Sequence, residues 1–127
     1  MLPQHQRIRT AAQFFDTQRS GSRFGNRNVV VSANIRPVAG QDPRAGFIVS
    51  KAVGNAVTRN KIKRRLRAIV ADLFKSDLDT HQGSVDVVVR ALPASASVDF
   101  DELQASTTQA VYGALRKFKR RDEQQGA

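Results

Sequence analysis

The sequence predicts a single α+β domain in which helices pack on a small sheet. Helix-type and strand-type hydrophobic patterns alternate along the chain and are joined by short connections. The central helical pattern is apolar on one side only, so this helix must cover a sheet. A chain of 127 residues with 40% hydrophobic and 25% charged side chains has enough apolar material for one core.

The N-terminal part of the chain predicts a helix followed by two strands. Thr10 is a suitable N-cap for a helix that runs through Gln18 and ends before a Gly-Ser break. Residues 28–36 (NVVVSANIR) and 45–50 (AGFIVS) have the apolar and β-branched composition of strands. Two prolines and a glycine lie between them, so we expect these strands to form a hairpin with a long loop.

The middle of the chain predicts a long basic helix and then a third strand. Residues 84–91 (SVDVVVRA) are strongly β-branched and form the strand. The helix covers about 18 residues, and its apolar residues follow helical spacing. These residues are Ile62, Leu66, Ile69, Val70, Leu73 and Phe74.

The last element is a helix from about residue 99 to residue 119. Asp99 and Glu102 have the spacing of a capping arrangement at its start, and basic residues at 116–121 lie near its other end. We expect an ordered domain from about 7 to 120 and a flexible tail at 122–127. The apolar side of the helix consists of Phe100, Leu103, Val111, Leu115 and Phe118.

The charge balance predicts a polyanionic partner. The formal net charge is +10 and the sequence pI is about 11.3, which favours nucleic acid or an anionic membrane surface. The apolar runs are far shorter than the roughly 20 residues of a membrane span, so nucleic acid is the leading partner. The first residues lack the apolar core of a secretory signal and the chain has no Cys, so we expect a cytoplasmic protein.

The sequence offers no convincing protein active site. Asp99, Asp101 and Glu102 could hold Mg²⁺, but a solvated first helical turn explains them better. His5 and His81 have neither a neighbouring nucleophile nor metal-ligand spacing. We therefore predict no catalytic side chain and no metal-binding residue.

The basic segment predicts contact with RNA or DNA. Six of the nine residues from 59 to 67 are Lys or Arg, and no acidic residue occurs between 45 and 71. A merely solvated face normally mixes both signs of charge. Arg59 lies at the edge of the apolar stripe, so it either emerges from the first turn or is held against the fold for a purpose.

The first helix carries two adjacent aromatic residues with different expected roles. One of Phe14 and Phe15 should belong to the core, and the other could stack on a base of a single strand. The sequence does not decide which of the two is exposed. The arginines in reach of such a strand are Arg7, Arg9, Arg19 and Arg23.

Residues 50–70, SKAVGNAVTRNKIKRRLRAIV, resemble the signature of the protein subunit of bacterial ribonuclease P. That signature is an Arg-Asn-Arg core after Gly-Asn-Ala-Val, followed by Lys-Arg and a further Arg. RAGFIVSK at 44–51 and VDVVVRALPAS at 85–95 extend the resemblance to about residues 7–120. The chain departs from the pattern at Lys61, which replaces the second Arg of the core. It also has Gln18 and Ser32 where the family often has aromatic residues.

The resemblance implies the details of the fold. It implies an α-β-β-β-α-β-α sandwich with a small mixed sheet, of the type called ribosomal protein S5 domain 2-like. A fourth, short strand is then expected near 22–26 or inside the first hairpin. Strand-helix-strand units ordinarily cross over with right-handed geometry, but the resemblance implies a left-handed crossover around the basic helix.

The resemblance also implies a function without protein catalysis. Ribonuclease P removes the 5′ leader of precursor tRNA, and a large RNA with Mg²⁺ performs the hydrolysis. The protein is then expected to bind the catalytic RNA and the leader, to raise precursor affinity and to lower the Mg²⁺ requirement. The expected contacts to the catalytic RNA are Asn55, Arg59, Asn60, Lys61, Lys63, Arg64, Arg65 and Arg67. The expected leader contacts are Phe14, Arg19, Val30, Ser32 and Lys51.

Other functions remain open at this point. A structural protein that binds ribosomal RNA would use the same basicity. A DNA-binding regulator is disfavoured because a strand, not a helix, precedes the basic helix. The sequence does not determine the leader preference or the number of protein copies per RNA.

Overall fold

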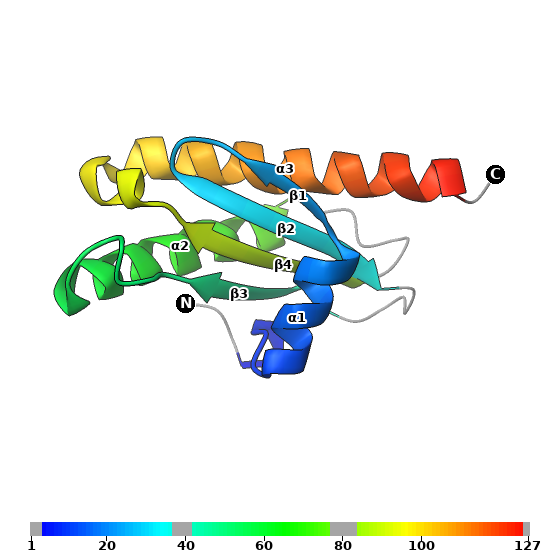
Figure 1. Cartoon of the computed structure of the whole chain (residues 1–127), viewed down its shortest axis with the longest axis horizontal. Helices are drawn as coiled ribbons and strands as arrows, with labels where there is room; N and C mark the ends of the chain where they lie inside the picture. Colours follow the sequence, from blue (N-terminus) through cyan, green and yellow to red (C-terminus); the bar gives the residue numbers. More distant parts are fainter. Residues whose placement is uncertain (1–3, 37–41, 77–83, 126–127) are drawn as a thin grey trace.

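Residues 4–36, 42–76 and 84–125 are described by the computed structural model (Figure 1). Their element order is the predicted α-β-β-β-α-β-α, with two short 3-10 helices added. The α-helices are Ala11–Ser20 (α1), Ala56–Ser76 (α2) and Phe100–Gln125 (α3), and the 3-10 helices are Gln4–Gln6 (η1) and Pro93–Ser97 (η2). The strands are Ser22–Gly25 (β1), Val29–Arg36 (β2), Arg44–Ile48 (β3) and Ser84–Ala91 (β4).

The strands form one mixed sheet in the order β1-β2-β4-β3. β2 pairs antiparallel with β1 on one side and with β4 on the other, and β3 pairs parallel with β4. The predicted hairpin between 28–36 and 45–50 is therefore wrong, because β4 lies between these two strands. β1 pairs with one edge of β2, and β4 pairs with the other edge along its full length. β3 therefore pairs with the free edge of β4. The short strand expected near 22–26 is β1.

The connection from β3 through α2 to β4 is the left-handed crossover that the resemblance implied. In Figure 1 both strands run from right to left, β4 lies above β3, and α2 passes behind the sheet. α2 and α3 pack on this face of the sheet and on each other, whereas α1 lies on the other face against β2 and β4. The α1 face is therefore the less covered of the two.

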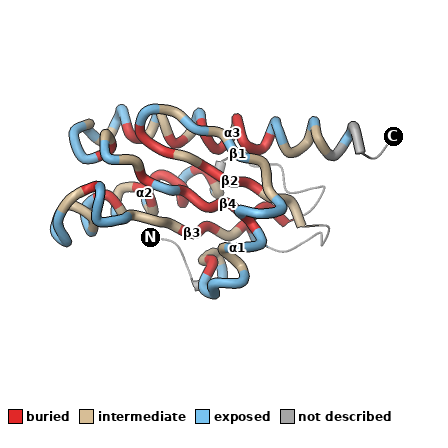
Figure 2. Tube along the Cα trace, in the orientation of Figure 1, coloured by how far each residue is buried: buried red, intermediate tan, exposed pale blue. Residues whose placement is uncertain are grey.

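The core lies between the sheet and the two long helices (Figure 2). The apolar stripe predicted for the basic helix is confirmed: Ile62, Leu66, Ile69 and Val70 are at most 1% exposed. α3 adds Leu103 and Val111, whereas its flanking Phe100 and Phe118 are half-buried. From the sheet, the core receives Val29, Val31, Ala33, Val85, Val87 and Val89.

α1 begins as the sequence predicts and ends slightly later. The Thr10 hydroxyl accepts a hydrogen bond from the Gln13 N–H at 3.1 Å, and the Gln13 side chain accepts one from the Thr10 N–H at 3.3 Å. This is a reciprocal capping box. The helix continues two residues beyond Gln18, to Ser20.

α3 is longer than the sequence predicts. Asp99 caps it as expected, because its Oδ1 accepts a hydrogen bond from the Glu102 N–H at 2.8 Å. The helix does not end at 119 but runs through Gln125, so 122–125 of the expected flexible tail are helical. Residues 126–127 lie outside the described residues. The Arg121 guanidinium donates to the carbonyl oxygens of Ser20 and Gly21, which ties this end of α3 to the end of α1.

One buried carboxylate on the sheet binds two arginines. Asp86 on β4 is 2% exposed. It accepts hydrogen bonds from Arg44 Nε at 3.0 Å and Nη2 at 2.8 Å, and Arg36 Nε lies 2.9 Å from its Oδ2. The hydrogen bond with Asp86 raises the pKa of Arg44 although burial opposes this. Arg36 and Arg44 are therefore cations that the fold itself uses.

Candidate nucleic-acid interface

The basic helix α2 begins at a glycine turn and an asparagine cap. Gly54 has a φ of 157°, a conformation that other residues rarely adopt. The Asn55 side-chain oxygen accepts a hydrogen bond from the Thr58 N–H at 2.9 Å and satisfies a donor at the helix start. The Gly-Asn pair of the motif thus fixes where the basic helix begins, and Asn55 remains exposed there.

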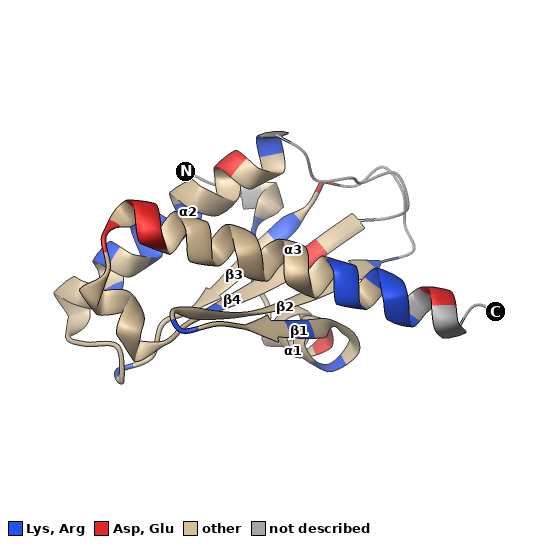
Figure 3. Ribbon diagram, turned by 90° about the horizontal axis from the view of Figure 1, so that it is seen from above, with Lys and Arg blue, Asp and Glu red and all other residues tan. Residues whose placement is uncertain are grey.

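The outer face of α2 carries the predicted basic residues. Asn60, Lys61 and Arg64 are exposed, and the other four predicted residues of the helix are half-buried on its flanks. Figure 3 shows Lys and Arg along the first half of α2. In the part of the chain that the structure describes, none of these cations forms an ion pair with an acidic side chain. Their charge is therefore available to a partner.

The two flanks of α2 differ in how the fold uses their arginines. On one flank, Arg65 Nη1 donates to the Val98 carbonyl oxygen at 3.3 Å and helps to hold α2 against the start of α3. On the other flank, the Nε of half-buried Arg59 is buried and has no hydrogen-bond partner among the described residues. A buried donor without an acceptor is costly. Of the two alternatives that the sequence left open for Arg59, the structure shows the second: its side chain is held against the fold.

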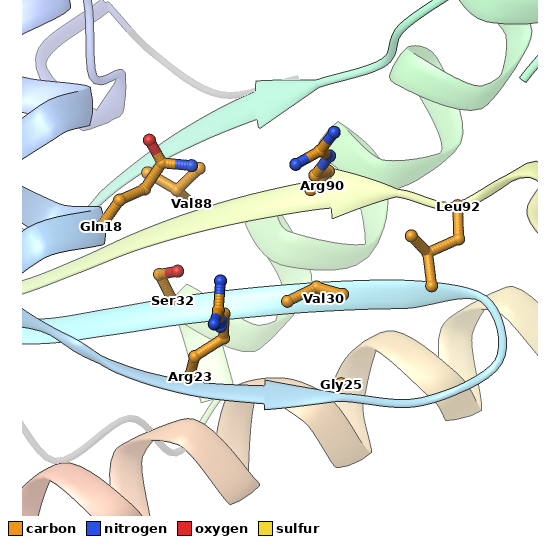
Figure 4. Close-up of a pocket in the computed structure, with 8 residues that line it drawn as sticks. All are labelled: Gln18, Arg23, Gly25, Val30, Ser32, Val88, Arg90 and Leu92. Atoms are coloured by element: carbon orange, nitrogen blue, oxygen red, sulfur yellow. The ribbon is translucent and has the colours of Figure 1, made fainter. Parts of the chain in front are cut away.

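A groove of about 330 Å³ lies on the sheet face that α1 leaves open (Figure 4). Two predicted leader residues, Val30 and Ser32 of β2, line it. Gln18 projects over the groove from α1. The remaining lining residues come from β1, β4 and the residue after β4: Arg23, Gly25, Val88, Arg90 and Leu92.

Phe14 lies in a second, smaller hollow and not in this groove. Its ring covers Gly46 of β3, where an added Cβ would lie 2.5 Å from Phe14 Cε1. The hollow has a volume of about 120 Å³ and also includes Lys63 and Arg67 from α2. The structure therefore brings Phe14 close to the basic helix around the edge strand β3.

The structure answers which phenylalanine of α1 is exposed. Phe15 is 58% exposed, whereas Phe14 is half-buried. The Arg19 guanidinium lies 5.8 Å from the centre of the Phe15 ring, so these two side chains form a cation–π pair on the outside of α1. Arg19 and Lys51 are exposed, and neither lines the groove or the hollow.

Arg90 lines the groove although it is not among the predicted leader contacts, and Arg23 is predicted only as one of the arginines in reach of a single strand. Arg90 is the one exposed residue of β4. Strand alternation carries the signal, because residues two apart point to the same face and Arg90 therefore shares the face of Val88. Arg23 had no such signal, because β1 is a strand of four residues with little hydrophobic pattern.

The structure describes one of the two histidines that the sequence offered as candidate catalytic or metal-binding groups. His5 Nε2 lies 3.1 Å from Asp42 Oδ2, and both side chains are exposed. His81 lies outside the described residues. Within the described ranges, no three His, Cys, Asp or Glu side chains are grouped so that they could share a metal ion. None of the helices that could be assessed there is long and apolar enough to cross a membrane.

Comparisons with known proteins agree over nearly the whole chain. A model of the family described as Ribonuclease P matches residues 2–115. The Ribonuclease P protein component of Kocuria rhizophila is 50% identical over 117 residues, covering 92% of this chain and 98% of that protein. The Micrococcus luteus protein of the same name is 47% identical over 123 residues, covering 91% and 92%. The solved RNase P protein of Staphylococcus aureus has a TM-score of 0.70 at 30% identity, covering 86% of this chain and 94% of that one.

Proposed function

The chain belongs to the ribonuclease P protein family, and from this premise we propose which surface meets which RNA. The protein is the RNA-binding accessory subunit of the tRNA-processing ribonuclease P. We assign α2 to the catalytic RNA and the groove beside α1 to the 5′ leader of precursor tRNA. The hydrolysis itself belongs to the RNA, and the holoenzyme acts in the cytoplasm.

One observation supports the assignment of α2: the signature segment forms the first part of this helix, contains no acidic residue, and places basic side chains on its exposed outer face. Arginine and lysine side chains that neutralise phosphates release counterions, which supplies sequence-independent affinity. Arginine forks also bind two phosphate oxygens at once. Asn55 and Asn60, exposed on the same helix start, add donors and acceptors for the RNA backbone.

The proposal for the groove rests on its shape and lining. It is open on the sheet face, contains Val30 and Ser32, and is flanked by two arginines. A single strand of RNA fits such a surface because its bases are free to lie on apolar side chains while cations meet its phosphates. Phe14, Arg19 and Lys51 lie outside the groove and are proposed to contact flanking nucleotides. Leader contacts favour precursor over mature tRNA because the product lacks the leader.

The Mg²⁺ of the holoenzyme is proposed to bind to RNA. The described residues offer no cluster of carboxylate or imidazole ligands for it, so we place it between RNA phosphates. When bound, it supplies the charge that the hydrolysis requires. The cations of α2 screen the same phosphates, and the protein is therefore proposed to lower the Mg²⁺ concentration that the holoenzyme needs.

A charge placed in the groove tests the leader assignment. We expect Val30→Glu to weaken holoenzyme binding of leader-bearing precursor tRNA by about tenfold, because it sets a carboxylate against leader phosphates. Binding of the same tRNA without a leader should not change. The measurement is an equilibrium titration of labelled tRNA with holoenzyme.

Ala105→Glu is the matched control for this experiment. Ala105 is exposed on α3, which covers the opposite face of the sheet, so the same change of charge should leave both affinities unaltered. If Val30→Glu weakened binding of the two tRNAs equally, or weakened neither, the assignment of the groove to the leader would be refuted.

A further inference from the structure

We propose that Arg23 and Arg90 form a guanine-reading site for one base of the leader. The inference rests on the proposed function of the groove and adds a preference to it. None of the residues that line this groove is aromatic, so none offers a ring for a base to stack on. Two guanidinium groups flank the same groove instead.

The strand register places the two arginines diagonally across the groove. Arg23 of β1 is opposite Ser32 of β2, and Arg90 of β4 is opposite Val30 in the next row of the same face. Two strand spacings and one two-residue step separate their Cα atoms by roughly 12 Å. Figure 4 shows both side chains rising from the sheet on the side of the groove. Two extended arginine side chains can therefore reach one base from opposite sides.

Both guanidinium groups are free to bind a ligand. Arg23 and Arg90 are exposed, and neither side chain has a hydrogen-bond or ion-pair partner within the described part of the chain. Arg36 and Arg44 differ, because Asp86 on β4 neutralises them. No acidic residue lines the groove. The groove therefore offers positive charge and hydrogen-bond donors, which suit a ligand with electron-rich acceptor atoms.

The floor of the groove favours a base over a phosphate alone. Val30, on the strand between the two arginines, and Leu92, at one end of the groove, provide its apolar surface, with buried Val88 beneath. A planar base gains from covering such a surface, whereas a phosphate would have to leave water to lie on it. The volume of about 330 Å³ is near the lower end of ligand pockets, roughly 300–1,000 Å³, and suits a single nucleotide.

Guanine is the base whose edge matches arginine donors. Its N7 and O6 are two adjacent acceptors, and a guanidinium binds both at once. Adenine and cytosine place an amino donor at the corresponding edge, which an arginine cannot accept. The second guanidinium can lie over the base plane. Gln18, at the rim, has an amide oxygen that can accept from the amino group of guanine.

A guanine scan of the leader tests this site. The probes are precursor tRNAs with an all-uridine leader in which one guanine, or one adenine, is moved position by position. We expect guanine at one position to tighten holoenzyme binding about 5- to 150-fold relative to adenine there. Replacing that guanine with 7-deazaguanine, which lacks the N7 acceptor, should remove most of the gain.

The protein variants separate base reading from simple charge. Arg23→Ala and Arg90→Ala should each abolish the guanine preference, and at least one of Arg23→Lys and Arg90→Lys should lose it while keeping most of the affinity for the all-uridine leader. Arg116→Ala, which removes an exposed arginine of α3, should keep the preference. Thermal melting of each variant confirms that it is folded.

Three outcomes would overturn the proposal. One is the absence of any guanine-preferring position. A second is that the alanine variants weaken all leaders equally, which indicates phosphate contacts and leaves the leader assignment intact. The third is equal binding of leaderless and leader-bearing tRNA, which would refute the leader assignment as well.

Discussion

Asp86→Ala is expected to lower the free energy of unfolding by about 3–5 kcal/mol, because it leaves two arginines without their buried counter-charge. The Asp86 side chain is 4% exposed, and those of Arg36 and Arg44 are 25% and 19% exposed. When Asp86 is removed, the desolvation of the two arginines is no longer compensated by a buried negative charge. The measurement is equilibrium urea unfolding of the protein, followed by circular dichroism.

Two further variants give this prediction its controls. Asp16→Ala removes an exposed carboxylate of α1 and should change the free energy of unfolding by no more than about 0.5 kcal/mol. The triple variant Asp86→Leu, Arg36→Met, Arg44→Met replaces the whole ion set by apolar groups and should recover most of the lost stability. A small loss in Asp86→Ala would show that the ion set does not hold the sheet together.

Arg59→Ala and Arg64→Ala are each expected to weaken binding to the catalytic RNA by about 1–3 kcal/mol, the range of a lost charged hydrogen bond. Arg64 is exposed on the outer face of α2, and Arg59 holds a buried donor that lacks a partner among the described residues. Each variant should also reduce the slope of log K against log salt by about one unit, because one phosphate contact is lost. The measurement is a titration of the RNA at several salt concentrations.

Lys75→Ala is the control within the same helix. Lys75 is exposed in the last turn of α2, outside the signature segment. Its removal changes the net charge by the same amount and should leave both the affinity and the slope nearly unchanged. Unchanged affinity of Arg59→Ala and Arg64→Ala at physiological salt would refute the assignment of α2 to the catalytic RNA.

Local patterns predicted the elements well because side-chain periodicity is a local property. The strand predicted at 84–91 has the bounds of β4, and the stripe from Ile62 to Leu73 faces the core. The pairing of strands is not local. Nothing within 28–36 or 45–50 indicates that residues 84–91 will lie between them, so the sequence predicts a hairpin of two strands that β4 in fact separates.

The positions of the candidate site residues could be predicted only in part, for the same reason, and their contacts with RNA stay predictions. The family signature located the basic helix, and Val30 and Ser32 do line the groove. The choice between Phe14 and Phe15 depends on Gly46, whose missing side chain makes room for the Phe14 ring. This contact joins α1 to a strand more than 30 residues away in the sequence, and no local pattern shows it.

The most direct test of the accessory-subunit account is single-turnover cleavage of a leader-bearing precursor tRNA at low Mg²⁺. The reaction is run with the protein alone, with the catalytic RNA alone and with both together. We predict no cleavage by the protein alone and much faster cleavage by the mixture than by the RNA alone. Cleavage by the protein alone would reveal an active site among its side chains, and a mixture no faster than the RNA alone would contradict the account.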